Sequence, residues 1–328
     1  MGFGQKIMCD SCSSPDRFSG VFNGYESYEK GIEYGWRLKS YLLEPGLPEV
    51  VSLRFQNDNI TFARSSTNAI MSGQLVAERP AISFFFPQQS SQGEVVLNGR
   101  PCRDEVICVM PQGGQVDLIL PKNCLLYSFC MAADWLDSLG YGSLVDLLQG
   151  EARILTLQQQ EAQAIRDCLH PVAEYLSHDR DPAEASCHMI EQYQDKLLPL
   201  VAKLVPDKLP IFSECGSRQD HEHLHQLLNY IGEHLDSSLT VDFLAEWRGI
   251  SSRYVQQLFQ RYVGVSPKKY LRSARLNEVR RNLLQIEPRR GLVTEVASQY
   301  GFDHLGQFSR DYKALFGELP KETLSRQS

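Results

Sequence analysis

Hydrophobic and polar residues alternate over short stretches between residues 49 and 131, whereas most of the remaining chain repeats its hydrophobic residues with the period of a helix. The segment "VSLRF" (51–55) alternates as a strand with one buried face does. "EVVLNGRP" places Asn98-Gly99 after a β-branched run, which predicts a type I′ hairpin turn. Several short strands at close spacing favour a small barrel or sandwich.

The pattern changes to helices after this region. Three segments, "ADWLDSLGYGSLVDLLQG", "TLQQQEAQAIRDCLHPVAEYLSH" and "DPAEASCHMIEQYQDKLLPLVAKLV", predict helices, the last opened by Asp181 as its cap. The polar segment "PDKLPIFSECGSRQD" holds two prolines and predicts a linker. We therefore expect an α+β chain of two domains: a mobile tail (1–20), a β-rich barrel or sandwich with flanking C-terminal helices (21–205), a linker (206–220) and an all-α domain (221–328).

The all-α domain contains the same arrangement twice. We expect a helix-turn-helix at about 240–262, a linker helix at about 266–284 and a second helix-turn-helix at about 293–316. Thr240 and then Ser251 or Ser252 are the expected caps of the first unit, and Gly249 supplies a positive φ at its turn. In the second unit, Gly301 is expected to supply the positive φ at the turn and Asp303 to cap the helix that follows. The expected inward residues are Val255, Leu258, Phe259 and Tyr262 in the first unit, and Phe308, Tyr312, Leu315 and Phe316 in the second.

Composition adds a charge asymmetry to this picture. The chain has net charge −7, yet residues 218–328 hold 16 basic and 13 acidic residues. Within Arg248–Arg290 the numbers are 11 and 2, a net +9. Like charges at that density repel one another, which suggests an anionic partner. A basic segment that joins two helix-turn-helix units favours double-stranded DNA, because the second helix of such a unit fits the major groove.

The exposed face of the first unit has side chains suited to reading bases. Arginine fits guanine with two hydrogen bonds and glutamine fits adenine in the same way. The spacing predicts that one arginine and three glutamines share the face opposite the buried stripe: Arg253, Gln256, Gln257 and Gln260.

Residues 222–324 resemble the DNA-binding domain of the AraC/XylS transcription regulators. The resemblance rests on "LTVDFLAEWRGISSRYVQQLFQRYVGVSPKKYLRSARLNEVRRNL" and on "YGFDHLGQFSRDYKALFG". Within that family, "ARLNEVRRNL", "GFDHLGQFSRDY" and "LFGELPKETL" look most like the regulators of ethanolamine-utilisation operons. The resemblance implies a homodimeric transcription activator that responds to a small effector, acts with RNA polymerase and is not an enzyme.

Position by position, the resemblance also implies roles for single residues. Arg253, Gln256 and Gln257 would face bases in the first unit, and Leu305, Gly306 and Arg310 in the second, with His304 as a further candidate. Gly306 has no side chain, so we expect the second unit to discriminate less. The candidates for phosphate contacts are Lys268, Lys269, Arg272 and Lys313. The linker helix adds Arg275, Arg280 and Arg281 to the basic charge.

The acidic N-terminal domain is the expected sensor. Aromatic residues on its strands are candidates for an effector pocket, although a buried aromatic more often belongs to the core. These candidates are Trp36, Phe55, Phe62, Phe84, Phe86, Tyr127 and Phe129. If the effector is an amine, it needs an aromatic cage or a carboxylate, and Glu78, Asp104, Glu105 and Asp117 lie in or beside the strands. The helices at 156–177 and 184–204 form either a dimer seam or a layer on the sheet.

Two alternative functions stay open. A DNA-directed enzyme is one, because "PCRDEV" around Cys102 resembles the Pro-Cys-His-Arg nucleophile of alkyltransferases, some of which carry this DNA-binding domain; the histidine, however, is absent here. A DNA-binding protein without any ligand is the other.

The sequence offers little for a metal or a cofactor, and we expect neither. Cys9 and Cys12 have metal-like spacing but lie in the tail without a second pair, and His221 and His225 read as surface residues. All eight histidines lie at or after position 170, so the β region lacks imidazole ligands. Nine cysteines, no apolar leader and no long apolar run predict a cytoplasmic chain with reduced thiols and no membrane span.

Overall fold

The fold is described from a computed structural model of the whole chain. The described residues are 16–31, 35–88, 90, 92–102, 105–147, 150, 152–178, 193–208, 218–235 and 239–325. The expected cap Asp181 and the pair Cys9 and Cys12 lie outside them. Among the helices of this described part, none has the length and apolar character needed to cross a bilayer.

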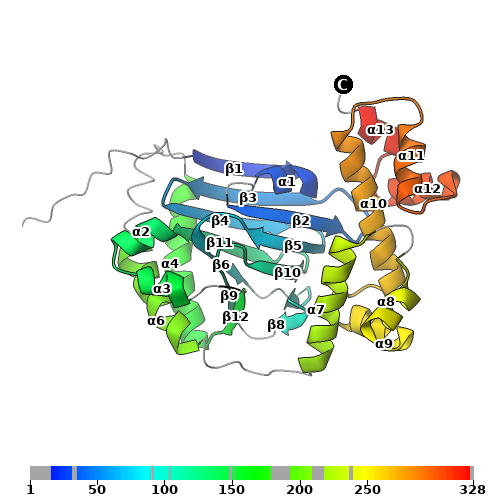
Figure 1. Cartoon of the computed structure of the whole chain (residues 1–328). Coiled ribbons are helices and arrows are strands. Elements are labelled where there is room, and N and C mark those ends of the chain that lie inside the picture. Colours follow the sequence, from blue (N-terminus) through cyan, green and yellow to red (C-terminus); the bar gives the residue numbers. More distant parts are fainter. Residues whose placement is uncertain are drawn as a thin grey trace, which may run out of the picture.

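Two antiparallel sheets form the N-terminal domain (Figure 1). The seven-stranded sheet has the order β1-β3-β4-β11-β6-β9-β12 and the five-stranded sheet the order β2-β5-β10-β7-β8. The strands are β1 (Asp16–Asn23), β2 (Trp36–Leu42), β3 (Glu49–Gln56), β4 (Ile60–Thr67), β5 (Met71–Ala77), β6 (Ala81–Pro87), β7 (Val95–Leu97), β8 (Arg100–Cys102), β9 (Val106–Met110), β10 (Gln115–Leu120), β11 (Leu125–Ala132) and β12 (Arg153–Thr156). The expected β-rich sandwich is confirmed, and β1 includes Asp16–Gly20, which the sequence assigned to the tail.

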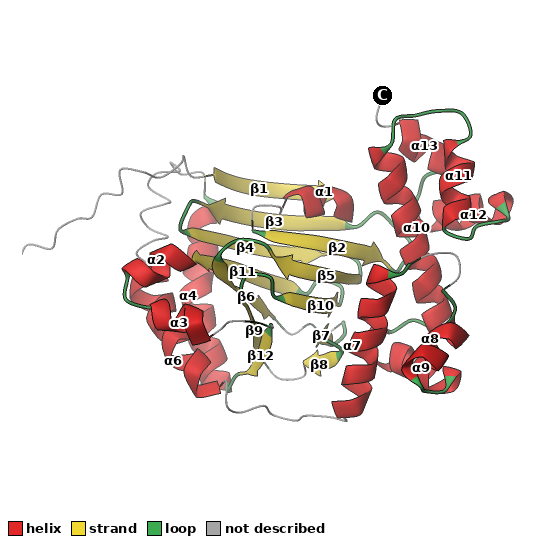
Figure 2. Ribbon diagram, viewed as in Figure 1, coloured by secondary structure: helices red, strands yellow, loops and turns green. Residues whose placement is uncertain are grey.

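Helices cover both outer faces of this sandwich (Figure 2). Those of the N-terminal domain are α1 (Tyr25–Gly31), α2 (Ala133–Ser138), α3 (Gly142–Leu147), α4 (Gln159–Ser177), the π-helix η1 (Tyr193–Leu197) and α6 (Leu198–Lys208). Those of the C-terminal domain are α7 (Arg218–Glu233), α8 (Val241–Arg248), α9 (Ser252–Leu258), the π-helix η2 (Phe259–Val263), α10 (Pro267–Gln285), α11 (Leu292–Gln299), α12 (Leu305–Phe316) and α13 (Pro320–Ser325). Helix α6 ends at Lys208 and α7 begins at Arg218, so most of the expected linker (206–220) lies outside the described residues.

Three hydrophobic cores hold these layers together. The sandwich core lies between the two sheets and continues into the second helix-turn-helix. The outer core lies between the seven-stranded sheet and α2, α3, α4, η1 and α6. The apolar stripe of α4, which includes Ile165, Leu169 and Val172, is buried in the outer core, so packing on the sheet uses the residues expected to form a dimer seam. The docking core joins the outer face of the five-stranded sheet to α7–α10.

Strand β6 shows how residues of one strand serve two cores. All seven of its residues are buried, so both of its faces are covered. Phe84 and Phe86 point into the outer core, whereas Phe85 points into the sandwich core. Trp36 of β2 lies in the sandwich core too, and its indole Nε1 donates a hydrogen bond to Ser83 Oγ at 2.8 Å. Because side chains alternate between the two faces of a strand, Phe85 lies on one side of the sheet and its neighbours Phe84 and Phe86 on the other.

Helix α7 docks on the five-stranded sheet through polar contacts as well as the docking core. His225 Nδ1 lies 2.7 Å from Asp117 Oδ2 of β10. The amide nitrogens of Gln74 and Gln115 both donate to Asn229 Oδ1, each at 3.0 Å. These contacts hold α7 in a fixed position against the five-stranded sheet.

The β7–β8 hairpin touches α7 at a glycine. Asn98 and Gly99 have φ of 46° and 73°, which confirms the predicted type I′ turn. A Cβ added to Gly99 would lie 2.4 Å from the carbonyl oxygen of His221. Glycine is needed here for its backbone conformation and because the α7 backbone leaves no room for a side chain.

We expect Gly99→Ala to destabilise the chain by about 3 kcal/mol, since it adds a clash with α7 to the cost of a positive φ. Gly113→Ala is the matched control, because Gly113 has φ of 76° and nothing within 4 Å of an added Cβ. Urea unfolding of both variants measures the difference. Equal losses would show that the hairpin does not press on α7.

Two buried histidines of α7 predict a pH dependence, and the expectation that His221 is a surface residue is wrong. Burial lowers the pKa of His221 and of His223 from the ordinary value of 6.5, with Arg100 and Arg248, respectively, as second causes. The unfolded chain then binds protons that the folded chain does not, so stability is complete above about pH 7 and falls as the pH drops through 6.5. Thermal unfolding between pH 7.5 and 5.5 measures this. The double variant His221→Phe/His223→Phe should show a shallower decline, and an unchanged slope would contradict the prediction.

Candidate nucleic-acid interface

The first helix-turn-helix is built by local sequence signals. Thr240 caps α8 by accepting a hydrogen bond from the amide of Phe243 at 3.1 Å. Gly249 ends α8 with φ of 68°, as predicted, and Ser251 caps α9 by accepting from the amide of Tyr254. The expected inward stripe of α9 and η2 is buried, which confirms that part of the prediction: Val255, Leu258, Phe259 and Tyr262.

The base-reading candidates of the first unit all lie on the free face of α9 and η2. Arg253, Gln256, Gln257 and Gln260 are exposed. Within the described part of the chain, no hydrogen bond or ion pair holds the side chain of Arg253, Gln256 or Gln257. These donors and acceptors are therefore available to an external partner.

The second helix-turn-helix repeats the arrangement with a different start. Gly301 has φ of 76° at the turn, as predicted, and the expected stripe of α12 is buried. The prediction that Asp303 caps α12 is wrong. His304 occupies the cap position and makes no side-chain cap hydrogen bond. Buried Phe302 packs on Phe308, with ring centroids 5.0 Å apart, and this packing sets where the chain enters the helix.

The exposed start of α12 carries the candidates of the second unit. His304, Leu305, Gly306 and Arg310 are all exposed. The sequence reasoning missed Gln307, which is also exposed. Its carbonyl accepts from Arg310 Nη2 at 2.7 Å, and its amide donates to Asp311 Oδ1 at 2.8 Å. Its i, i+3 and i, i+4 spacing on a recognition helix was the signal available in the sequence.

Some basic side chains of α10 are exposed, whereas others are buried in ion pairs. Lys268 and Lys269 are exposed at its first turn, and Lys313 is exposed on α12. Arg272 is exposed but forms an ion pair with Asp311 of α12. Arg280 and Arg281 are not available to DNA, which corrects the expectation for these two. Their side chains are only 5% and 14% exposed and form ion pairs with carboxylates.

The two recognition helices lie at different levels along α10. Figure 1 shows α9 below the lower end of α10 and α12 beside α10, on the side away from the sheets. The candidate side chains on both helices are exposed, so the N-terminal domain does not cover them. One continuous helix fixes the spacing between the two units, since α10 spans Pro267–Gln285.

Comparisons with known proteins support the same reading. Residues 244–326 match a helix-turn-helix domain family. The chain is 31% identical over 140 residues to the XylDLEGF operon transcriptional activator 2 of Pseudomonas putida, covering 43% of this chain and 88% of that protein. The chain belongs to the AraC/XylS family of transcriptional regulators.

Other relatives match over a smaller share of their length. The XylDLEGF operon transcriptional activator of Pseudomonas putida is 29% identical over 165 residues, 50% of this chain and 49% of that protein, so the chain spans about half the length of the first curated relatives it matches. A solved structure of a probable AraC family transcriptional regulator from Rhodopseudomonas palustris is 36% identical, with a TM-score of 0.30, over 32% of this chain and 95% of that chain. The assignment to the ethanolamine-operon subgroup is not confirmed.

The structure separates the seven aromatic candidates for an effector pocket. Trp36 lies in the sandwich core. The other six lie in the outer core, under the helices: Phe55, Phe62, Phe84, Phe86, Tyr127 and Phe129. The seven side chains therefore do not surround one space, and a role for any of them in effector binding stays a prediction.

The carboxylates considered for an amine already have cationic or histidine partners. Glu78 pairs with Arg37, Glu105 with Arg166 and Asp117 with His225, each at 2.7 Å. Asp104 lies outside the described residues. Glu105 still has one buried carboxylate oxygen, Oε2, without a hydrogen-bond partner among the described residues.

The thiol of Cys102 is poorly suited to act as the nucleophile of an alkyltransferase. Its side chain is buried, and burial raises the pKa of its thiol to about 12. A thiol that stays protonated at neutral pH is a poor nucleophile. In the described part of the chain, no three His, Cys, Asp or Glu side chains are grouped to hold a metal ion.

We predict that Arg253→Ala weakens binding to a cognate DNA site by about 1–3 kcal/mol and hardly changes binding to scrambled DNA, because the lost contacts are to base edges. Lys269→Ala is the control, and it should weaken both to a similar extent. Fluorescence anisotropy on both duplexes at one fixed salt concentration measures the effect. Equal loss on both duplexes for Arg253→Ala would assign that side chain to the DNA backbone.

Proposed function

We propose that this chain is a sequence-specific DNA-binding transcription activator. One observation carries the proposal: two recognition helices, joined through α10, both expose their candidate base-reading side chains. Arg253, Gln256 and Gln257 read bases in the first groove, and Arg310 with Gln307 reads the second. Leu305 and Gly306 offer little hydrogen bonding, so the first unit supplies most of the discrimination.

Phosphate contacts come from the exposed ends of the same elements. Lys268, Lys269 and Lys313 are exposed and lie at the first turn of α10 and on α12. Arg272 joins them after exchanging Asp311 for a phosphate oxygen. These contacts orient the chain on the duplex without reading its sequence.

The N-terminal domain serves as the sensor in this proposal. It binds a small effector, and two chains pair to act with RNA polymerase at promoters in the cytoplasm. Because the apolar stripe of α4 is already buried on its own sheet, a dimer through α4 would have to use the solvent-facing residues of that helix.

The DNA-binding proposal predicts a footprint with two protected major-groove segments on one face of the duplex, their centres about 34–36 Å apart. Genome-wide mapping of bound sites supplies the natural sequences, and chemical footprinting of the full chain on them measures the spacing. A single protected segment would contradict the use of both units. If deleting the gene for this chain leaves the transcription of genes beside the bound sites unchanged, the proposed role as a transcription regulator is contradicted.

The effector is tested separately by calorimetric titration of the full chain with ethanolamine, other small amines and amino acids. An amine that binds should also change the affinity for DNA, because the two binding equilibria are linked. No heat from any of them would remove the amine from the proposal. A chain that binds DNA equally well with every metabolite tried would favour the ligand-independent alternative.

A further inference from the structure

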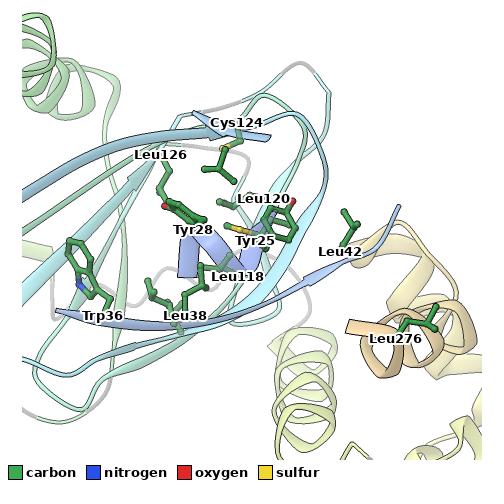
Figure 3. Packing of buried hydrophobic residues seen from close by; sticks show 14 of the residues in the cluster. Tyr25, Tyr28, Trp36, Leu38, Leu42, Leu118, Leu120, Cys124, Leu126 and Leu276 are labelled. Atoms are coloured by element: carbon green, nitrogen blue, oxygen red, sulfur yellow. The ribbon is translucent and has the colours of Figure 1, made fainter. Parts of the chain in front are cut away.

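The short helix α1 follows β1 and precedes β2 in the chain, and its two faces make different contacts. One face carries Tyr25 and Tyr28, which are 2% and 5% exposed and belong to the sandwich core. Figure 3 shows both rings among leucines of that core, including Leu118 and Leu126. The Tyr25 hydroxyl lies 3.4 Å from Thr67 Oγ1, at the end of β4. The two rings therefore fill space inside the sensor sandwich.

The other face of α1 holds the DNA-binding domain. Glu26 Oε1 lies 2.8 Å from Arg280 Nε, and Glu29 Oε1 lies 2.8 Å from Arg281 Nη2. The two glutamates are three residues apart and so lie on one side of the helix. They meet two consecutive arginines in the C-terminal third of α10.

The two arginines are also bound to other groups on both domains. Arg281 donates to Glu278 Oε1 at 3.0 Å and to the carbonyl oxygen of Ser40 on β2. Arg280 forms a second ion pair with Glu318, next to α13. Removing one partner from so buried a network leaves charge that water cannot fully solvate, which is strongly unfavourable. The position of α1 and the position of α10 therefore depend on each other.

A second connection joins β2 to α10. Leu42, at the end of β2, and Leu276 of α10 belong to the same hydrophobic core. Asn277, next to Leu276, binds the Leu42 backbone: its Oδ1 accepts from the Leu42 amide at 3.0 Å and its Nδ2 donates to the Leu42 carbonyl at 3.1 Å. A continuous packed path thus joins the sandwich interior to the second helix-turn-helix.

We propose that α1 is the coupling element between the sensor interior and the DNA-binding domain. A molecule that displaces the tyrosine rings of α1 from the sandwich core pulls Glu26 and Glu29 away from α10. The space suits an aromatic ring with a hydroxyl group, because that is what α1 itself places there. The biological use of this coupling rests on the proposed function, whereas the coupling can be measured without DNA.

The first test is hydrogen exchange of the full chain, followed by mass spectrometry. Tyr28→Ala should speed the exchange of α10 amides by about tenfold or more. Tyr193→Ala is the matched control: Tyr193 is an equally buried tyrosine of the sensor, but it lies in the outer core. It should leave α10 unchanged relative to the wild type. Similar exchange of α10 in both variants would overturn the proposal.

Adding p-cresol to Tyr28→Ala provides a rescue experiment, since an apolar cavity left by a truncated ring can bind a small aromatic molecule. Partial return of α10 protection supports the coupling. If p-cresol restores the protection of the sensor strands and leaves α10 fast, the coupling proposal fails.

A second pair of variants keeps the interior intact, in case Tyr28→Ala does not fold. Glu26→Gln/Glu29→Gln should speed the exchange of both α1 and α10. Glu105→Gln, which removes the similarly buried ion pair with Arg166 of α4, should change neither. Unchanged α10 exchange in the double variant would contradict the proposal. If the wild-type chain does not bind DNA but these exchange results are obtained, the proposed function is contradicted and the coupling proposal is not.

Discussion

Two consecutive arginines on one helix hold this molecule in its observed arrangement. Arg280 and Arg281 sit where the sensor sandwich, α10 and the second helix-turn-helix meet, and each is bound to carboxylates from different elements. Charges so far from water are tolerable only when they are paired and hydrogen-bonded. That requirement specifies one docking geometry, whereas the apolar contacts around it would tolerate several.

The docking geometry determines what the DNA-binding domain can present. The N-terminal domain contacts α7 and one side of α10, and the candidate side chains of α9 and α12 stay exposed (Figure 1). In the proposed function, a signal from the N-terminal domain therefore need not cover or uncover the DNA-reading face. It can act on the orientation of α10, to which both reading units are attached.

The sequence predicted the helix ends and turns that depend only on residues close together in the chain. Caps such as Thr240 and Ser251 and the left-handed Gly249 act within a few residues, so the ends of α8 and α9 could be read directly. Partners distant in the sequence could not be read. The charge of Arg280 and Arg281 suggested DNA, yet it is neutralised by α1, some 250 residues earlier in the chain. Six of the seven aromatic candidates face the helices and only Trp36 faces the space between the sheets, because alternation along a strand does not tell which face meets the other sheet.

Four cysteines in the sandwich core have a practical consequence. Cys102, Cys108, Cys124 and Cys130 are all buried, and burial raises the pKa of each thiol. An alkylating reagent reaches them only when the sheets separate. The labelling rate of each cysteine, measured peptide by peptide, would report how often the two sheets separate, without an engineered probe. A compound that binds between the sheets would lower these rates.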